Sequence, residues 1–382
     1  MQPPIAILGA GPGGLALARM LEINNIDYIV FERDETPIAI FTGGSLDIHA
    51  DDGQLVLKEA GLLEKFKALA RYDGQEFKSV DKDAKVIWHK KFSGQTDRPE
   101  IDRPQLRQML LDSVPKEKIR WDCKVESVEK QVDGLMTVRF ANGKQESGFK
   151  LVVGADGAWS KARALLTPAK PTFTGLYYLQ TTILPTNPHY AHIRSFAGSG
   201  SYTSLSSGNA IIAQQVSNGA YNIYIGLRLP EHWTKTNAEL IRSPGFRQYL
   251  IQTYFSDWSE EPLSLIRHSD GPFHSWPLYS LPLDALPWTS VEGVTLIGDA
   301  AHLAAPNGEG VNCAMFDGYR LAREIIRCGV EGLDEAVRCY EEDMFPRGKD
   351  SIQKGIDFVD MFFAADAPRA FREWTEQIPS SD

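Results

Sequence analysis

Glycine and aspartate stand together where a short apolar run near the end of the chain stops. The run from Val294 to Ile297 leads into Gly298 and Asp299, and a helix is expected to begin near Gly310. Small residues at the tip of a strand let a ligand approach the backbone closely. The Asp299 carboxylate can accept hydrogen bonds from hydroxyl groups, and the positive end of the helix favours an anionic ring. The segment therefore predicts a site for a ligand that carries hydroxyl groups and negative charge.

A glycine-rich turn near the start of the chain has the spacing of a dinucleotide-binding loop. Gly9, Gly11 and Gly14 follow the apolar run 5–8 and precede a segment with helical periodicity. Gly9 permits the tight turn, Gly11 lets a pyrophosphate reach the backbone, and Gly14 lets the helix pack on the sheet. Glu32 ends the next apolar run, where its carboxylate can accept hydrogen bonds from a ribose. The unit is typical of NAD(P) or FAD binding; a strand–helix–strand unit without a ligand is the alternative.

A third segment repeats this form in the middle of the chain. The apolar run 151–153 leads into Gly154, Asp156 and Gly157, and a basic stretch follows. Asp-Gly pairs are common in turns, so this segment alone is equally compatible with an ordinary turn. All three segments nevertheless share one order: a strand, a tip of small residues, then a helix or a loop.

These three segments together resemble the single-component (class A) FAD-dependent aromatic hydroxylases, over nearly the whole chain. In that family the first motif holds the ADP part of FAD, a motif like Asp156-Gly157 is linked to FAD and NAD(P)H, and one like Gly298-Asp299 holds the ribityl chain. The resemblance places Pro306 and Gly310 near the flavin ring. It implies bound, non-covalent FAD, transiently bound NADPH, and O₂ that reacts as a flavin hydroperoxide.

A narrower group is similar in the stretches FERD, GGSLDIH and PEIDRPQLRQMLL. These stretches resemble the tetracycline-inactivating flavin monooxygenases and their fungal and bacterial relatives. The resemblance assigns cofactor contacts to Arg33, Gly44, Asp47 and Arg103. From the residues alone, Arg103 at a helix start suits a phosphate or flavin oxygen, and a surface ion pair is the alternative.

Two positions near the cofactor depart from the family pattern. The loop from Pro306 to Gly310 is one residue shorter than the usual Pro-x-x-Gly-x-Gly. Ile40 stands where the tetracycline-inactivating enzymes carry an arginine that is tied to NADPH. The backbone that faces the ring and the contact with NADPH are therefore expected to differ from those enzymes.

The substrate half of the resemblance is weaker than the cofactor half. Gln180 matches the family, whereas Ser201 and Asn222 stand where the family has an arginine and a histidine. Gln180, Asn222 and Phe358 are the expected substrate contacts. Six aromatic residues belong either to the core or to an apolar pocket, and about one in three is expected to touch substrate. These are Tyr177, Tyr178, Tyr221, Tyr224, Phe273 and Trp276.

The pattern of runs and turns predicts an α/β fold. A Rossmann-like FAD-binding domain of the aromatic-hydroxylase type is expected with a sheet-based substrate domain and a C-terminal helix that stops at Pro368. The FAD-binding domain is expected in three parts, 1–74, 102–166 and 285–345. The substrate domain is expected to consist of a hairpin at 75–101, which turns at Lys82-Asp83, and of 167–284. The C-terminal helix is expected at 346–382 as a separate element.

Composition excludes several classes of partner. The net charge of −10 argues against nucleic acid, and no apolar run is long enough to span a membrane. The four cysteines are scattered and form no CxxC pair, and the HxxH of His189 and His192 lies in a loop-like stretch, so we expect no metal. The chain begins without a signal-peptide pattern, which predicts a cytoplasmic protein, expected to be monomeric.

The predicted function is FAD-dependent, NADPH-using hydroxylation of an aromatic or polycyclic small molecule by O₂. Tetracycline inactivation and a step in secondary metabolism are both compatible with the motifs. A flavin oxidase or Baeyer–Villiger oxygenase on the same scaffold is one alternative. A non-catalytic regulator that binds FAD or another ligand is the other.

Overall fold

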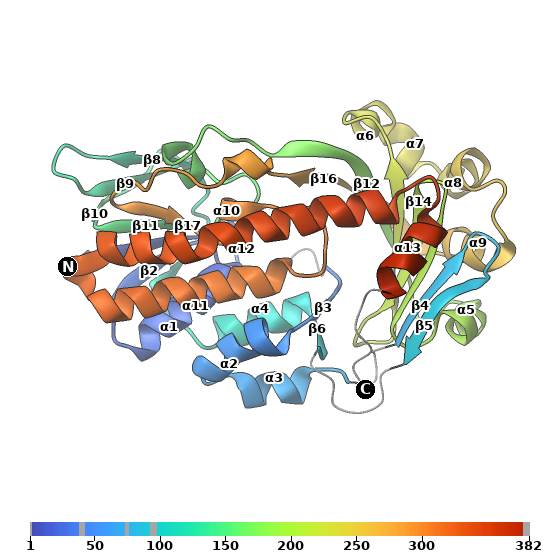
Figure 1. Cartoon of the computed structure of the whole chain (residues 1–382), viewed down its shortest axis with the longest axis horizontal. Coiled ribbons are helices and arrows are strands. Elements are labelled where there is room, and N and C mark those ends of the chain that lie inside the picture. Colours follow the sequence, from blue (N-terminus) through green and yellow to red (C-terminus); the bar gives the residue numbers. More distant parts are fainter. Residues whose placement is uncertain (1, 38–42, 73–75, 92–97, 377–382) are drawn as a thin grey trace. The chain divides into compact units, whose positions relative to one another are not determined.

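A computed structural model of the whole chain describes residues 2–37, 43–72, 76–91 and 98–376. The chain forms two compact units (Figure 1). Unit 1 consists of Met1–Ala70, Ile101–Thr172 and Tyr279–Gly355. Unit 2 consists of Arg71–Glu100, Phe173–Leu278 and Ile356–Asp382. Ile40, predicted to alter the NADPH contact, lies outside the described residues.

Unit 1 is built on a parallel sheet whose strands are almost completely buried. Its strands pair in the order β17-β11-β1-β2-β7. The bounds are β1 Ile5–Leu8, β2 Tyr28–Phe31, β7 Ile119–Arg120, β11 Leu151–Gly154 and β17 Val294–Leu296. Continuous apolar runs of this kind suit strands that are covered on both faces. The predicted Rossmann-like arrangement is confirmed.

Helices and two smaller sheets complete unit 1. The helices are α1 Pro12–Ile23, α2 Leu55–Glu59, α3 Leu63–Leu69, α4 Arg103–Leu111, α10 Asp299–His302 and α11 Gly310–Cys328. The smaller sheets are β10-β9-β8 and β3-β6, with bounds β3 Ser45–Asp47, β6 Glu100–Asp102, β8 Val125–Lys130, β9 Met136–Phe140 and β10 Gln145–Phe149. Short turns of 3₁₀ or π helix lie at 50–54, 116–118, 162–165, 283–285 and 330–332.

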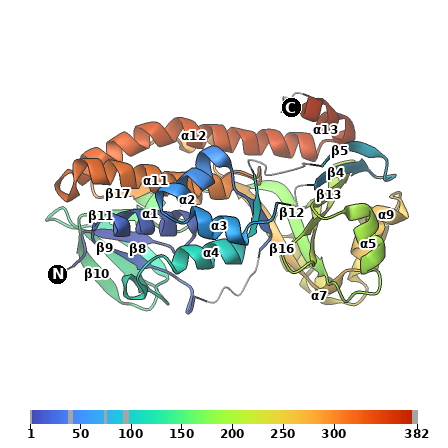
Figure 2. The ribbon, with the colours of Figure 1, turned by 90° about the horizontal axis from the view of Figure 1, so that it is seen from below.

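Helices α1 and α11 lie side by side in unit 1 (Figure 2). Glycines form their closest contacts. A Cβ atom on Gly13 would lie 2.7 Å from the carbonyl oxygen of Ala314, and one on Gly318 would lie 2.5 Å from that of Gly13. Such distances are shorter than van der Waals contact, so the two backbones can meet only where no side chain intervenes. This contact brings the N-terminal ends of two motif helices into one layer of unit 1.

Unit 2 is built on a mixed sheet with the strand order β16-β12-β15-β14-β13-β4-β5. The bounds are β4 Glu76–Asp81, β5 Val86–Lys91, β12 Thr172–Ile183, β13 Ser201–Ser206, β14 Asn209–Gln215, β15 Tyr221–Arg228 and β16 Asp270–Ser280. The hairpin of β4 and β5 joins the sheet through parallel pairing of β4 with β13.

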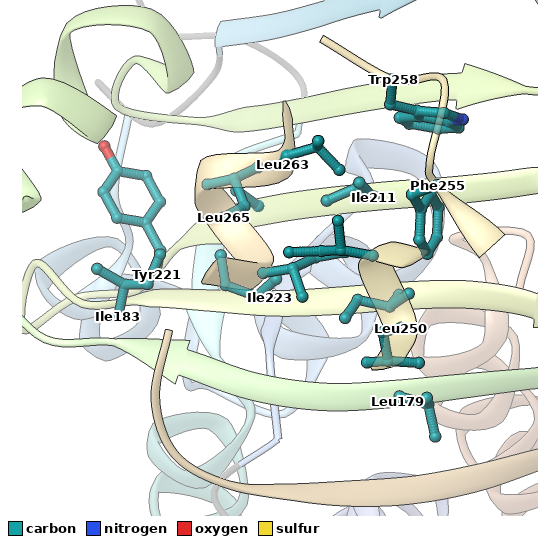
Figure 3. Packing of buried hydrophobic residues seen from close by; sticks show 14 of the residues in the cluster. Leu179, Ile183, Ile211, Tyr221, Ile223, Leu250, Phe255, Trp258, Leu263 and Leu265 are labelled. Carbon is teal, nitrogen blue, oxygen red and sulfur yellow. The ribbon is translucent and has the colours of Figure 1, made fainter. Parts of the chain in front are cut away.

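One face of this sheet carries the apolar core of unit 2 (Figure 3). It packs against α5 Tyr190–Ala197, α8 Phe246–Tyr254 and α9 Glu260–Arg267, while the short helices α6 Trp233–Thr236 and α7 Ala238–Arg242 lie nearby in the chain. Three of the six aromatic residues named in the sequence analysis belong to this core: Tyr177, Tyr221 and Phe273.

The C-terminal helices differ from the sequence prediction at Pro368. Helix α12, Leu333–Phe362, continues through Pro346, and α13 follows at Ala367–Glu376. Pro368 was expected to stop a helix, but it lies in the first turn of α13, where its missing N–H would have no partner within the helix. In the part of the chain that the structure describes, no helix has the length and apolar character to cross a bilayer.

A buried glutamate supports β17 from α12. Glu341 Oε1 accepts hydrogen bonds from Trp288 Nε1 at 3.0 Å and Thr295 Oγ1 at 2.8 Å, while Oε2 has no partner among the described residues. Burial raises the pKa of Glu341 above its ordinary value. The protonated acid is therefore the form that suits this position.

The substitution Glu341→Gln is expected to raise the melting temperature relative to the unaltered protein, and this difference is expected to grow as pH increases. Because the pKa of Glu341 is raised by folding, its contribution to stability is complete below its ordinary pKa of 4.5 and is lost as pH rises through the folded value. The neutral amide avoids that loss, and the difference in Tm is expected to reach about 2–4 °C at pH 8. Calorimetric melts of both proteins from pH 5 to about pH 8 measure it. A constant difference across this range would contradict the assignment.

Candidate functional site

The carboxyl ends of the parallel strands bring the three predicted motifs together in unit 1. Strands β1, β11 and β17 are neighbours, so their C-terminal tips share one edge of the sheet. Ala155 N donates to Leu8 O, and Ile297 N donates to Gly154 O, both at 2.9 Å. In open parallel sheets, ligands bind at this edge.

The first tip is a tight turn with an open approach at its centre. Gly9 has φ of +113°, and a Cβ atom there would lie 2.3 Å from Ala155 O. A Cβ atom on Gly14 would lie 2.1 Å from Gly9 O. A Cβ atom on Gly11 would meet no described atom within 4 Å. Gly9 and Gly14 are therefore required by packing, whereas Gly11 faces open space before the N-terminus of α1, which has no side-chain cap.

Glu32 lies at the tip of β2 and is engaged by the backbone. Its Oε2 accepts from Ala10 N at 2.6 Å, and its Oε1 accepts from Asp34 N at 3.0 Å. A carboxylate has about four lone-pair sites, so these bonds leave room for a hydroxyl donor. Arg33, the next predicted residue, is exposed.

Arg107 on α4 is a residue of this tip that sequence reasoning missed. Its Nε donates to Ala10 O at 3.1 Å, and its Nη2 pairs with Asp34 Oδ2 at 3.0 Å and lies 4.0 Å from Glu32 Oε2. It is four residues after Arg103, on the same helix face, which was the available signal.

Asp156 at the tip of β11 has one satisfied and one unsatisfied oxygen. Its Oδ2 accepts from Lys161 N at 2.7 Å. Its Oδ1 is buried and has no hydrogen-bond partner among the described residues. A buried carboxylate oxygen of this kind is costly unless a partner is supplied. An added hydrogen-bond donor would satisfy it.

Arg163 joins the second and third tips. Its side chain is 3% exposed, and its three nitrogens donate to backbone carbonyls: Nε to Ala300 at 2.8 Å, Nη1 to Ala158 at 2.9 Å and Nη2 to Asp299 at 2.9 Å. The sequence showed only a basic stretch after Asp156-Gly157. The structure shows that one cation of this stretch fixes the two tips to each other.

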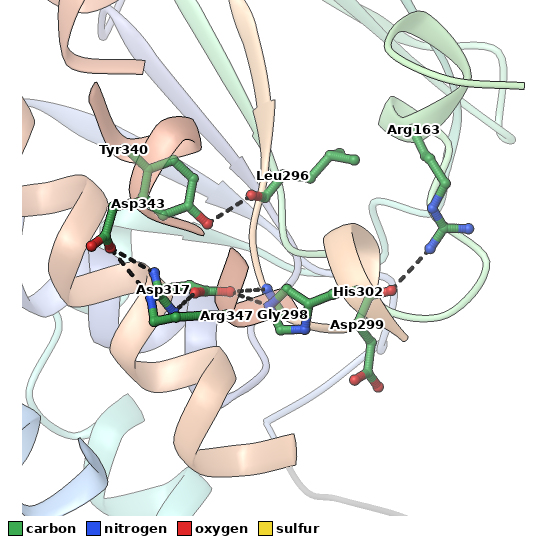
Figure 4. A network of polar contacts seen from close by, with 9 residues as sticks. All are labelled: Arg163, Leu296, Gly298, Asp299, His302, Asp317, Tyr340, Asp343 and Arg347. Atoms are coloured by element: carbon green, nitrogen blue, oxygen red, sulfur yellow. Dashed lines mark hydrogen bonds and ion pairs between the residues drawn. The ribbon is translucent and has the colours of Figure 1, made fainter. Parts of the chain in front are cut away.

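A buried ionic network, centred on a carboxylate of α11, stabilises the third tip (Figure 4). Asp317 on α11 is fully buried, and its Oδ2 accepts from Gly298 N at 2.9 Å and contacts His302 Nε2 at 2.6 Å. Its Oδ1 pairs with Arg347 Nη1 at 2.8 Å, and Arg347 also pairs with Asp343. Gly298 has φ of +59°, and a Cβ atom there would lie 2.8 Å from the Ala314 Cβ. The tip is thus held by a glycine conformation and a carboxylate together.

The titration of this network follows from its contacts. Burial alone would raise the pKa of Asp317, but the charge and hydrogen bond of His302, with the charge of Arg347, lower it. Burial alone would lower the pKa of His302, but the charge and hydrogen bond of Asp317 raise it. The contacts of each partner therefore favour an imidazolium at His302 and a carboxylate at Asp317.

Asp299 turns its carboxylate away from this network, as Figure 4 shows. Its side chain is accessible to water. Surrounding protein atoms nevertheless raise the pKa of Asp299 by burial, against the charges of His302, Arg103 and Arg163. Because the side chain is exposed, a hydroxylated ligand can reach this carboxylate and find an acceptor there.

The shortened loop 306–310 is closed by its own side chains and by α12. Asn307 Oδ1 accepts from Glu309 N at 2.9 Å, and Asn307 Nδ2 donates to Ser351 O at 3.0 Å. Lys354 Nζ pairs with Glu309 at 3.0 Å. Pro306 and Gly310 are both exposed, and a Cβ atom on Gly310 would meet no described atom within 4 Å. The N-terminus of α11 therefore has neither a side-chain cap nor a crowded approach.

Asn312, which sequence reasoning also missed, fastens the segment of Asp47 to α11. Its Oδ1 accepts from His49 N at 3.0 Å, and its Nδ2 donates to Asp47 O at 2.9 Å. Its side chain is completely buried. The available signal was an asparagine two residues after Gly310. Its partners lie 263 and 265 residues earlier in the chain, and nothing in the sequence indicates that pairing.

Arg103 and Gly44 lie together in unit 1. Arg103 N donates to Gly44 O at 3.2 Å. A Cβ atom on Gly43 would lie 2.8 Å from Arg103 Cδ, so the arginine stem passes directly over the Gly43-Gly44 turn. Arg103 itself is exposed at the first residue of α4.

The predicted substrate residues lie in unit 2. Gln180 on β12 accepts a hydrogen bond from Trp276 Nε1 at 2.9 Å. Asn222 lies on β15, directly across from Thr182. Phe358 on α12 stacks on Phe362, with ring centroids 4.7 Å apart.

Several features of unit 1 fit FAD. Gly11 and Gly310 face open space at two uncapped helix N-termini, where a pyrophosphate and an anionic ring would bind. The carboxylates of Glu32 and Asp299 can accept from ribose and ribityl hydroxyls. The orphan Oδ1 of Asp156 requires a donor that the described residues do not provide.

Comparison with known proteins agrees with this geometry. The family model described as "FAD binding domain" matches residues 2–232. The monooxygenase penA of Penicillium thymicola is 30% identical over an alignment of 403 positions, gaps included, that covers 91% of this chain and 93% of that protein.

Solved structures share the fold at lower identity. Klebsiella pneumoniae HpxO, solved with FAD and uric acid, is 20% identical with a TM-score of 0.79, over 98% of this chain and 92% of that one. The tetracycline destructase Tet(51) is 22% identical with a TM-score of 0.73, over 98% and 95%. The chain belongs to the FAD-binding-domain family and is an FAD-dependent monooxygenase of the aromatic-hydroxylase type.

Proposed function

We propose that this monooxygenase takes its electrons from NADPH and hydroxylates an aromatic or polycyclic small molecule. The observation that carries the proposal is the meeting of three strand tips in unit 1, with open backbone at Gly11 and Gly310 and an outward carboxylate at Asp299. Bound FAD would accept the hydride and activate O₂ there.

The chain's own residues would bind and orient that cofactor. Gly11 would admit the pyrophosphate to the N-terminus of α1, and Glu32 would accept from the adenosine ribose. Asp299 would accept from the ribityl hydroxyls. The uncapped N-terminus of α11 would favour negative charge on the ring, and Arg103, at the start of α4, would add a cation for a flavin or phosphate oxygen.

NADPH is proposed to bind transiently. The chain has one complete GxGxxG, at Gly9, Gly11 and Gly14, so a second dinucleotide of this type would need another mode of binding. Asp156-Gly157 supports this assignment through its resemblance to the family motif that is linked to both nucleotides.

The substrate proposal is supported by residues of unit 2 and by the relatives. HpxO was solved with uric acid, a planar heteroaromatic compound, and Tet(51) is named a tetracycline destructase. Gln180, Asn222 and Phe358 are proposed to contact the substrate. Because Gln180 alone matches the drug-binding residues of the tetracycline-inactivating group, tetracyclines belong in the test panel but are not the first expectation.

The test is NADPH oxidation by the purified yellow protein with tetracyclines and polyphenolic aromatics as stimulants. The proposal expects substrate-stimulated NADPH consumption and one ¹⁸O atom from ¹⁸O₂ in the product. Hydrogen peroxide without oxygen transfer would indicate an oxidase instead, and ring expansion or ester formation a Baeyer–Villiger oxygenase. Light scattering on the same preparation tests the expected monomer.

A further inference from the structure

The face of the unit 2 sheet opposite its apolar core carries an inference about substrate class, which rests on the proposed function. Successive side chains of a strand point to opposite faces. Leu179 and Ile223 point into the core with α8 and α9 (Figure 3). Gln180 and Tyr224 therefore lie on the opposite face, where they are directly paired across β12 and β15.

Two neighbouring rows of side chains cross this face without a formal charge. Their strand-to-strand pairing is given by the registers of β12, β15, β14 and β13. One row is Gln180, Tyr224, Ile212 and Thr203, and the next is Thr182, Asn222, Gln214 and Ser201. Neither row contains a carboxylate, an ammonium, a guanidinium or an imidazole.

Two hydrogen-bond donors on β12 have no partner in the described part of the chain. Gln180 uses Oε1 to accept from Trp276, which leaves its Nε2 without an acceptor there. The hydroxyl of Tyr178 makes no hydrogen bond to a described residue either. Burial, with Tyr224 nearby, raises the pKa of Tyr178, so the phenol remains a neutral donor. Two residues along a strand span about 7 Å, the reach of a bicyclic ring.

Aromatic side chains flank these donors. The Trp276 indole is 40% exposed, although it is tied to Gln180 through its N–H. Phe363 covers the adjoining position, because a Cβ atom on Gly226 would lie 2.6 Å from its ring, and its centroid is 6.3 Å from that of Tyr178. A planar ring can stack or pack edge-on here.

Arg228, the arginine that β15 places on this face, does not neutralise an anion at Gln180. Arg228 donates to Phe363 O at 3.3 and 3.4 Å, and it lies four residues, or about 13 Å, along β15 from Tyr224. His274 lies two residues before Trp276 on β16. Its side chain is exposed and interacts with another residue. A carboxylate held by Gln180 and Tyr178 would lose water without gaining a counter-charge, which is unfavourable.

We propose that this face selects an uncharged planar aromatic substrate through a carbonyl or amide oxygen. The oxygen accepts from Gln180 Nε2 and Tyr178 Oη, and the ring lies against Trp276. Aromatic carboxylates of the same size are disfavoured, because Gln180 and Tyr178 offer them donors without a positive charge.

Isothermal titration of the FAD-loaded enzyme with naphthalene-2-carboxamide and naphthalene-2-carboxylate tests this preference. The two probes share size and shape and differ in charge. The carboxamide is expected to bind at least about tenfold more tightly near neutral pH. Gln180→Ala is expected to weaken carboxamide binding about tenfold. The control Gln252→Ala changes an exposed glutamine of α8, on the core side of the sheet, and is expected to change nothing.

A charge reversal distinguishes recognition from structural damage. Gln180→Lys places an ammonium on the face and is expected to shift the preference towards the carboxylate. Equal or tighter carboxylate binding by the unaltered enzyme, or no carboxamide binding at millimolar concentration, would overturn the inference. Such a result in protein that holds FAD and oxidises NADPH would leave the proposed function intact, whereas failure to hold FAD would contradict the proposed function itself.

Discussion

The substitution Gly11→Ala is expected to weaken FAD binding about 100-fold, or about 2.7 kcal/mol, without lowering the melting temperature of the FAD-free protein. A Cβ atom at Gly11 meets no described atom within 4 Å, and the residue has φ of −79°, which alanine adopts readily. The added methyl group would instead fill the space in which a pyrophosphate must meet the N-terminus of α1. Calorimetric titration with FAD and a thermal melt of the FAD-free protein measure the two quantities.

Two other glycines provide matched controls for this result. Gly245 has φ of −78° and a Cβ atom there meets nothing within 4 Å, so Gly245→Ala should change neither affinity nor melting. Gly14→Ala places a Cβ atom 2.1 Å from Gly9 O and is expected to destabilise the FAD-free protein by about 1–3 kcal/mol. If Gly11→Ala lowers melting as Gly14→Ala does, or leaves FAD affinity unchanged, the assignment of Gly11 is wrong.

The substitution Asp317→Asn is expected to cost about 3 kcal/mol of unfolding free energy and to weaken FAD binding as well. It removes the carboxylate that His302, Arg347 and Gly298 N share, and it leaves the positive charge of Arg347 facing a neutral group. The tip that carries Asp299 then loses its support. Chemical denaturation and FAD titration measure the two effects.

The pH dependence of this substitution follows from both partners. The Asp317 contribution is present above its ordinary pKa and is lost as pH falls through its lowered folded value. The His302 contribution is present below its ordinary pKa and is lost as pH rises through its raised folded value. The stability difference should therefore be greatest between about pH 4 and pH 6.5 and should decrease at higher pH.

Asp343→Asn is the control for Asp317→Asn. Asp343 also pairs with Arg347, but 35% of its side chain is exposed. Exposed pairs contribute about 0–1 kcal/mol, so the effect is expected to be small. An effect of Asp317→Asn no greater than that of Asp343→Asn would contradict a special role for the buried network.

The motif glycines were predictable because their role is local. Gly9, Gly11 and Gly14 lie within six residues, and the apolar runs on either side already define the strand and the helix that position them. The same holds for Asp299 at the end of β17. The fold class followed from the order of such segments, and it is confirmed by the parallel sheet of unit 1.

The supporting contacts were not predictable, because they join residues that are far apart in the chain. Arg163 donates to carbonyl groups 136 and 137 residues later, and Asn312 fastens a segment 265 residues earlier. A single sequence contains no sign of these pairings. The helix stop expected at Pro368 was wrong for a different reason: proline suits the first turn of a helix as well as the residues after one.

The side of a strand on which an aromatic residue lies was also undetermined. Tyr177 and Tyr178 are neighbours, but the first belongs to the core of unit 2 and the second lies on the opposite face. Alternation along β12 separates them, and only the register of the sheet shows which of the two faces the helices.

A crystal structure of the enzyme with FAD tests the central claim most directly. The account predicts one FAD whose pyrophosphate contacts the backbone at Gly11, whose ribityl hydroxyls reach Asp299, and whose ring lies against the N-terminus of α11. An FAD bound elsewhere, or one that contacts the first tip but neither Asp299 nor Gly310, would contradict it.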